Sequence, residues 1–193
     1  DLVSRFLSLF FTPAAMGVAA LAEPIILIFA GEKYTSSVPI LMVMGFFGAL
    51  TALTPMLGYL LITHKRTKAF MAANLTAIAC ALAFSPILLS CLSPLLGIAL
   101  VKGLALVFLL AFYLILTREL ARVDGRALAK GLAGSLIMAL AVYTAQSFLR
   151  NLLFLPAHVL LGILIYAAWL RAVRGLSHED VLIISRVLPL RLR

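Results

Sequence analysis

The chain has 193 residues, of which 64% are hydrophobic and only 12% are charged, and its mean hydropathy is +1.17. Soluble domains are about half apolar and about a quarter charged, so this composition excludes a soluble globular protein and indicates an integral membrane protein. The formal net charge is +9, from 16 basic and 7 acidic residues. Because the basic residues gather in loops between apolar stretches, we attribute the excess to membrane topology and expect no nucleic-acid partner.

The first two apolar stretches form a predicted helical hairpin, around which the rest of the chain is organised. Its first arm is interrupted only by Glu23-Pro24, and its second arm carries no charge between Lys33 and Lys65. A helix needs roughly 20 apolar residues to cross the hydrocarbon core of a bilayer, and each arm is long enough. The hairpin therefore predicts two membrane spans in contact with lipid.

The spacing of the remaining charges predicts four more spans. Stretches of 33, 15, 19 and 20 residues without Asp, Glu, Lys or Arg separate the charged positions between residues 69 and 170. We therefore expect an all-α integral membrane fold, a six-helix transmembrane bundle within residues 1–175, with spans at about 6–30, 37–62, 69–90, 95–117, 128–148 and 153–171. Residues 176–193 are expected to form a cytoplasmic amphipathic tail, because apolar residues alternate there with serine and arginine.

The distribution of basic residues predicts the orientation of the chain. Thirteen of them fall on one side of the predicted spans and only Lys33 and Arg150 on the other, with Lys102 inside a span. Positive residues mark cytoplasmic loops, so we expect a multi-pass protein of the cell membrane with both ends of this segment in the cytoplasm. Because the chain opens at Asp1 and enters a span almost at once, we also expect it to be the C-terminal part of a longer protein.

Prolines and small residues within the predicted spans predict kinks and close helix contacts. Two prolines fall in each arm of the hairpin: Pro13, Pro24, Pro39 and Pro55. They predict kinks that shape the packing of the helices, with moving hinges as the alternative. Small residues recur at helical spacing in the third and fifth spans, where they predict close contacts between helices: Ala69, Ala73, Ala77, Cys80 and Ala83, and Gly131, Ser135 and Ala139.

Residues suited to catalysis or metal binding are few. Six of the seven acidic residues belong to predicted loops or ends, the three histidines are scattered, and the sequence has no phosphate-binding glycine loop and no metal-spaced His/Cys cluster. We therefore predict no enzyme, no catalytic residue, no metal site and no cofactor. An integral membrane glycosyltransferase or acyltransferase is the less favoured alternative, because it needs such a site at a membrane face.

Two ionisable residues fall inside predicted spans, where such residues are costly and usually functional. Glu23 and Lys102 each lie about eight residues, or roughly 12 Å of helix, from the outer end of their span. We predict that both face the interior of the bundle, where they can pair. Two alternatives stay open: Lys102 snorkels to the outer headgroups, or Glu23 lies nearer the surface.

One polar residue in the third span has two interpretations. Asn74 is interpreted first as an interhelical hydrogen bond and second as a substrate contact.

Several stretches of the chain resemble the polysaccharide flippase family. They are the apolar span with its Phe/Gly/Tyr turn (Leu21–Tyr34), the start of the next span (Val38–Leu41), the basic turn (Leu61–Lys68), the later outer turn (Pro94–Ala99) and the tail (Leu176–Arg193). The resemblance covers nearly the whole chain. The polysaccharide flippase family belongs to the multidrug/oligosaccharidyl-lipid/polysaccharide exporter superfamily.

The resemblance implies a fold and an activity. Members have two six-helix lobes around a central cavity, so this chain would be the second lobe and its N-terminal lobe would be missing from the sequence. The implied substrate is a polyprenyl-linked oligosaccharide, which is moved from the cytoplasmic to the outer leaflet. Family cavities are often lined by cations. The resemblance implies that Lys102 is the equivalent cation of the substrate cavity here, with Arg150 at the outer rim as a weaker candidate. A multidrug exporter or a peptidoglycan-precursor flippase of the same superfamily is the alternative.

Overall fold

The computed structural model describes residues 2–120, 125–148 and 154–173, and within these ranges the chain is all-α. The tail predicted at residues 176–193 lies outside them. The helices are α1 (Leu2–Ala20), α2 (Ala22–Phe29), the 3₁₀ helix η1 (Glu32–Ser37), α3 (Val38–Leu50), α4 (Thr54–Thr63), α5 (Thr67–Cys91), α6 (Pro94–Thr117), α7 (Gly125–Phe148) and α8 (Leu155–Ala172).

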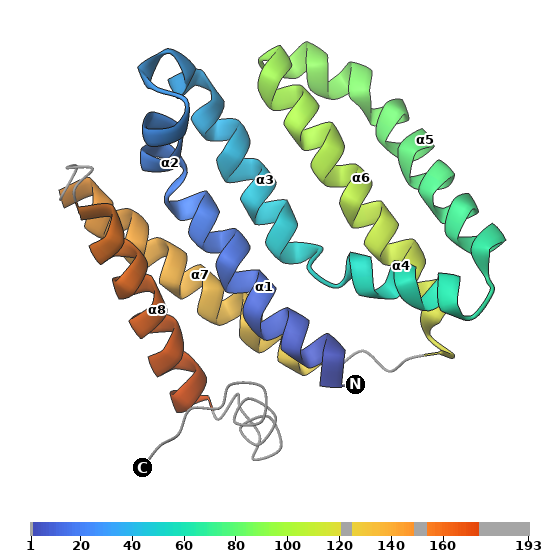
Figure 1. Cartoon of the computed structure of the whole chain (residues 1–193). Coiled ribbons are helices and arrows are strands. Elements are labelled where there is room, and N and C mark those ends of the chain that lie inside the picture. The colour runs from blue at the N-terminus through green and yellow to red at the C-terminus, as the bar shows by residue number, and fades with distance from the viewer. Residues whose placement is uncertain (1, 121–124, 149–153, 174–193) are drawn as a thin grey trace.

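The long helices pack side by side in the order α8, α7, α1, α3, α6 and α5 (Figure 1). This order is an open row, with α5 and α8 at its two ends, and α4 lies across the end of the row at which α3 stops. The start of α1 and the end of α8 lie at that same end (Figure 1). An even number of crossings returns the chain to the side from which it started, as the six-span prediction requires.

Within the described ranges, five helical segments are long and apolar enough to cross a membrane, and the number rises to six if α1 and α2 count as one broken span. Four of the spans follow the spacing of charges closely: α5, α6, α7 and α8 begin and end within three residues of their predicted bounds. These helices have the length of a bilayer crossing because their apolar stretches are long. Their charged residues other than Lys102 lie near the helix ends, as Lys68 does in α5 and Lys130 in α7.

The first predicted span, 6–30, is not one straight helix. It is a pair of helices bent by 70° at Leu21. Pro24 has no amide hydrogen, and its ring would clash with the carbonyl oxygen of Ala20 four residues earlier. Helix α1 therefore ends at Ala20, and α2 begins at Ala22, with Leu21 between them.

The second predicted span, 37–62, is wrong in its extent. The candidate span runs over Glu32–Leu50, and Thr54–Thr63 forms a separate short helix, α4. Pro55 lies in the first turn of α4, where a missing amide hydrogen costs little, so this proline starts a helix instead of kinking a continuous one. The ten residues of α4 reach about 15 Å, too short to cross the bilayer.

Glycines bring neighbouring helices into direct contact. A Cβ atom at Gly45 of α3 would lie 2.7 Å from the Cβ of Ala19 on α1, and one at Gly131 of α7 would lie 2.9 Å from the carbonyl oxygen of Ser8. The prediction that small residues bring α7 close to a neighbour is thereby confirmed at Gly131. Small residues at these positions let membrane helices approach closely.

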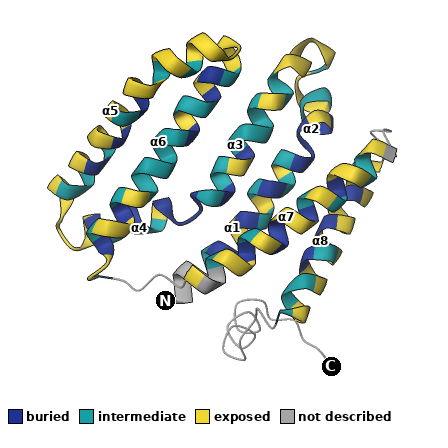
Figure 2. Ribbon diagram, turned by 180° about the vertical axis from the view of Figure 1, so that it is seen from behind, coloured by how far each residue is buried: buried dark blue, intermediate teal, exposed yellow. Residues whose placement is uncertain are grey.

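The small-residue pattern of α5 holds in part. Ala73, Ala77 and Ala81 are buried, whereas Cys80 is half-buried and Ala83 is exposed. The buried face therefore follows a strict four-residue spacing and diverges from the predicted stripe after Ala77. Figure 2 shows α5 exposed along its outer side, as expected for a helix at the end of the row.

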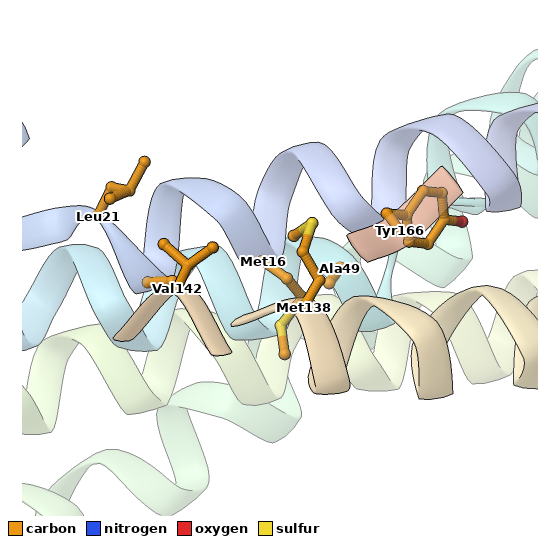
Figure 3. Packing of buried hydrophobic residues seen from close by; sticks show 7 residues of the cluster. Met16, Leu21, Ala49, Met138, Val142 and Tyr166 are labelled. Atoms are coloured by element: carbon orange, nitrogen blue, oxygen red, sulfur yellow. The ribbon is translucent and has the colours of Figure 1, made fainter. Parts of the chain in front are cut away.

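Two clusters of buried side chains hold the row together. One joins α1, α3, α7 and α8 and is shown in Figure 3: Met16, Ala20, Leu21, Ala49, Met138, Val142 and Tyr166. The other joins α4, α5 and α6: Leu53, Leu57, Leu61, Ala73 and Tyr113. The buried leucines of α4 recur every four residues, so one face of this short helix is fixed against the ends of the long ones.

A polar network lies within the apolar contact of α1 and α7. The hydroxyl of Ser135 donates to Gly131 O at 2.6 Å and lies 3.2 Å from Thr12 Oγ1, and the Thr12 hydroxyl donates to Ser8 O. Thr12 and Ser135 are fully buried. Paired hydroxyls of this kind join membrane helices because an unpaired polar group costs free energy in hydrocarbon.

Candidate functional site

Lys102 is the one charged residue of α6, and its side chain is exposed. The next residue, Gly103, faces α3 so closely that a Cβ atom there would lie 2.2 Å from the ring of Phe47. The backbone beside Lys102 is therefore fixed by the α3–α6 contact, while its ammonium group projects from an otherwise apolar helix. A cation in this position can attract an anionic group that enters the membrane region.

Glu23 lies in the first turn of α2, immediately after the break from α1, and its side chain is exposed. Its Oε2 atom accepts a 3.4 Å hydrogen bond from Nε2 of Gln146 on α7. The other polar atom of that amide, Oε1, is buried and has no hydrogen-bond partner among the described residues. The bent span therefore presents a carboxylate–amide pair at the point where its helix is interrupted.

The predicted pairing of Glu23 with Lys102 is wrong for this structure. Glu23 bonds to α7, whereas Lys102 lies on α6, and α3 lies between α2 and α6 in the row (Figure 1). The two residues lie on helices that do not pack together. The sequence could not show the order of the helices, which decides which residues meet.

Asn74 forms an interhelical hydrogen bond, which confirms the first of its two interpretations. Its Nδ2 atom lies 2.8 Å from the hydroxyl of Tyr113 on α6 and 2.8 Å from the carbonyl oxygen of Phe70 on its own helix. The rings of Phe70 and Tyr113 stack with centroids 5.9 Å apart. Asn74 thus joins α5 to α6. Its second interpretation, as a substrate contact, stays a prediction, and Arg150 lies outside the described residues.

A groove with a volume of about 550 Å³ lies between α1, α7 and α8, and the sequence analysis did not predict it. Its floor is buried and its rim is exposed. Leu9, Met138, Val142, His158 and Tyr166 form the floor, and Phe10, Val18, Val159 and Ile163 form the rim. Figure 3 shows Met138 and Val142 projecting from α7 toward α1.

The groove exists because small residues line the two helices that face each other across it. Ala14 and Gly17 lie on α1, and Gly162 and Ala167 lie on α8. Each of these residues leaves out side-chain volume that a leucine would fill. A run of small residues in the first and last spans was the signal available in the sequence, but pairing those two spans requires the three-dimensional arrangement.

Comparisons of the chain with protein-family models, with curated proteins and with solved structures found no match. For the part of the chain that the structure describes, the fold is all-α with five or six candidate membrane spans. Among the described residues, no group of three or more His, Cys, Asp or Glu side chains is placed to hold a metal ion.

Proposed function

We propose that this chain is one lobe of a flippase that moves a polyprenyl-linked oligosaccharide across the cell membrane. The observation that carries the proposal is Lys102, an exposed cation that lies eight residues after the start of an otherwise apolar helix. Charged residues inside membrane helices are rare and mark substrate or ion pathways. A cation suits the phosphate that links the saccharide to its lipid carrier.

The arrangement of helices supports a transporter over a static scaffold. The row is open, with α5 and α8 at opposite ends, and the first span is broken beside Glu23. Broken helices with polar residues at the break are typical of the substrate and coupling sites of transporters. In the proposed mechanism a second lobe completes the cavity, and rocking of the two lobes alternately opens it to the two sides of the membrane.

The proposal assigns no chemical reaction to the chain. The saccharide class comes from the family resemblance of five stretches: Leu21–Tyr34, Val38–Leu41, Leu61–Lys68, Pro94–Ala99 and Leu176–Arg193. The orientation in which both ends of this segment lie in the cytoplasm comes from the distribution of lysine and arginine. The saccharide class and the orientation are therefore each tested by an experiment of their own.

A complementation experiment tests the proposed function. The full-length gene is expressed in a bacterial host that lacks its own flippase, and surface polysaccharide is measured together with the amount of protein in the membrane. Lys102→Ala is compared with Lys68→Ala, which removes an exposed lysine from the start of α5. We expect restoration by the parent and by Lys68→Ala, and roughly tenfold less polysaccharide with Lys102→Ala, the size of one lost charge-assisted contact.

The outcomes separate the function from the site. Restoration by both variants supports the flippase and assigns Lys102 to interaction with headgroups. Failure of all three proteins, at normal membrane levels and with several saccharide types, would overturn the proposed substrate class. Efflux assays with cationic drugs would then test the multidrug exporter.

A further inference from the structure

We propose that α4 is an interfacial anchor, a helix that lies along the headgroup boundary of one leaflet and is followed by a turn that binds anionic phospholipid. The turn comprises His64, Lys65 and Arg66, which connect α4 to α5. The proposal is independent of the transport function, because it uses only the position of α4, the exposure of its side chains and the charges that follow it.

The short helix α4 is apolar on two sides, and the protein covers only one of them. Leu57 and Leu61 are fully buried on the side that faces the other helices, whereas Tyr59 is 70% exposed and Ile62 is 42% exposed. No residue of α4 is charged. A helix that is apolar all round is normally buried, either in protein or in a membrane. We therefore infer that lipid covers the side that carries Tyr59 and Ile62.

The position of α4 limits how deep this side can lie. The helix lies across the end of the row of long helices (Figure 1), and at about 15 Å it is too short to cross the bilayer. Lys65 and Arg66 follow it at once and are exposed, and charged groups are costly inside hydrocarbon. Tyrosine, in contrast, is enriched where hydrocarbon meets the headgroups. Both constraints place α4 at the headgroup boundary.

The backbone holds the basic turn against the end of α4. Lys65 adopts a left-handed conformation, with φ 58°. Its amide nitrogen donates to the carbonyl oxygen of Ile62 at 3.0 Å, and that of Arg66 donates to Leu61 O at 2.9 Å. These bonds close the helix in the manner of a C-terminal cap. The two cations therefore leave α4 from a defined position, next to its exposed apolar side.

The charge of the turn is suited to an anionic partner. Among the described residues, the ion pair at this turn joins Arg66 to Glu119 at 3.9 Å, and both side chains are exposed, so the pair contributes little free energy. Arg118, the neighbour of Glu119, is exposed as well. No described carboxylate lies within ion-pair distance of Lys65. A basic residue near the membrane surface favours anionic over neutral lipid by about fivefold.

Lipid preference in matched variants tests the basic turn. The protein is purified in a mild detergent, and native mass spectrometry compares its affinity for phosphatidylglycerol with that for phosphatidylcholine. Lys65→Gln removes the charge, Lys65→Arg keeps it, and Lys33→Gln removes an exposed lysine from η1 at the opposite end of the row. We expect the preference for phosphatidylglycerol to fall about fivefold in Lys65→Gln only. An unchanged preference in Lys65→Gln, or an equal fall in Lys33→Gln, would overturn the lipid assignment.

Fluorescence quenching tests the depth of α4. With Cys80 and Cys91 replaced by serine, a fluorophore is attached at Tyr59→Cys or at Ile78→Cys, an exposed position in the middle of α5. In vesicles of phosphatidylcholine and phosphatidylglycerol, we expect lipid brominated near the headgroup to quench the probe at residue 59 more strongly than lipid brominated near the chain end. The probe at residue 78 should show the reverse.

Two other outcomes would overturn the interfacial anchor. Quenching at residue 78 without quenching at residue 59 would show that water, a partner protein or a second copy of the chain covers the exposed side of α4. Stronger quenching of residue 59 by the deeper bromines would place α4 within the hydrocarbon core.

Discussion

The hydroxyl of Tyr166 on α8 donates a 2.7 Å hydrogen bond to the carbonyl oxygen of Leu9 on α1. Leu9 is the residue four positions before Pro13, so its carbonyl has lost the amide hydrogen that an α-helix would supply. An unpaired carbonyl is costly within a membrane, and a neighbouring helix commonly satisfies it. Pro13 thus creates an acceptor in α1 that the last helix of the chain uses.

Removal of this hydrogen bond should loosen α8. Tyr166→Phe keeps the ring but leaves the Leu9 carbonyl unpaired, and we expect a loss of about 1 kcal/mol. The apparent melting temperature should fall by about 2–4 °C in a thermal-shift assay. Tyr143→Phe, at an exposed position on α7, is the control, and an equal fall in both variants would show that the hydrogen bond contributes nothing specific.

The Asn74–Tyr113 hydrogen bond should couple α5 to α6. Tyr113→Phe retains the ring that stacks on Phe70, so it removes only the hydroxyl. In a double-mutant cycle with Asn74→Ala we expect a coupling free energy of about 0.5–1.5 kcal/mol, the range measured for hydrogen bonds between membrane helices. Asn74→Ala combined with Tyr143→Phe should be additive, and additivity in both cycles would refute the coupling.

The α3–α6 contact should be sensitive to a single methyl group. A Cβ atom at Gly103 would lie 2.2 Å from the Phe47 ring, whereas one at Gly48 would lie 3.6 Å from Ala15. We expect Gly103→Ala to destabilise the protein by about 1–3 kcal/mol through overpacking. Gly48→Ala should be neutral or slightly stabilising because alanine favours the helix. Denaturation by heat or by a harsh detergent measures the difference, and equal stability of the two variants would contradict the packing.

The sequence predicted the helices far better than their contacts. Apolar stretches without charge gave the bounds of α5, α6, α7 and α8, because the thickness of the bilayer fixes the length of a span. The hairpin was harder, since a proline either kinks a helix or starts a new one. Pro24 ends α1, and Pro55 starts α4. Both outcomes depend on what surrounds the freed backbone groups.

In the candidate site, too, the residues were easier to predict than their contacts. Residue type and depth singled out Lys102, Glu23 and Asn74 from the sequence. The sequence predicted that Asn74 bonds to another helix, but it did not identify Tyr113 as the partner. The partner of Glu23 was not foreseen, because Gln146 is 123 residues away and reaches it only through the α1–α7 contact. The groove depends on α1, α7 and α8 together, and no local pattern records such a three-helix arrangement.

The orientation of the chain can be tested with two exposed turns. His64 lies between α4 and α5, and Ser93 lies between α5 and α6, at opposite ends of α5. With Cys80 and Cys91 replaced by serine, we expect Ser93→Cys to react with an impermeant maleimide in intact cells and His64→Cys only after permeabilisation. The reverse pattern would invert the proposed topology, and labelling of both in intact cells would contradict a span at α5.

Translocation in proteoliposomes tests the proposed function most directly. The full-length protein is reconstituted with a fluorescent polyprenyl-diphosphate saccharide, and an impermeant reagent that quenches the fluorophore reports which leaflet holds it. We predict that the protein exposes the inner-leaflet pool to the reagent and that Lys102→Ala slows this exposure about tenfold, while Lys68→Ala leaves it unchanged. Translocation no faster than in protein-free vesicles, by well-folded parent protein supplied with its coupling gradient, would contradict the flippase.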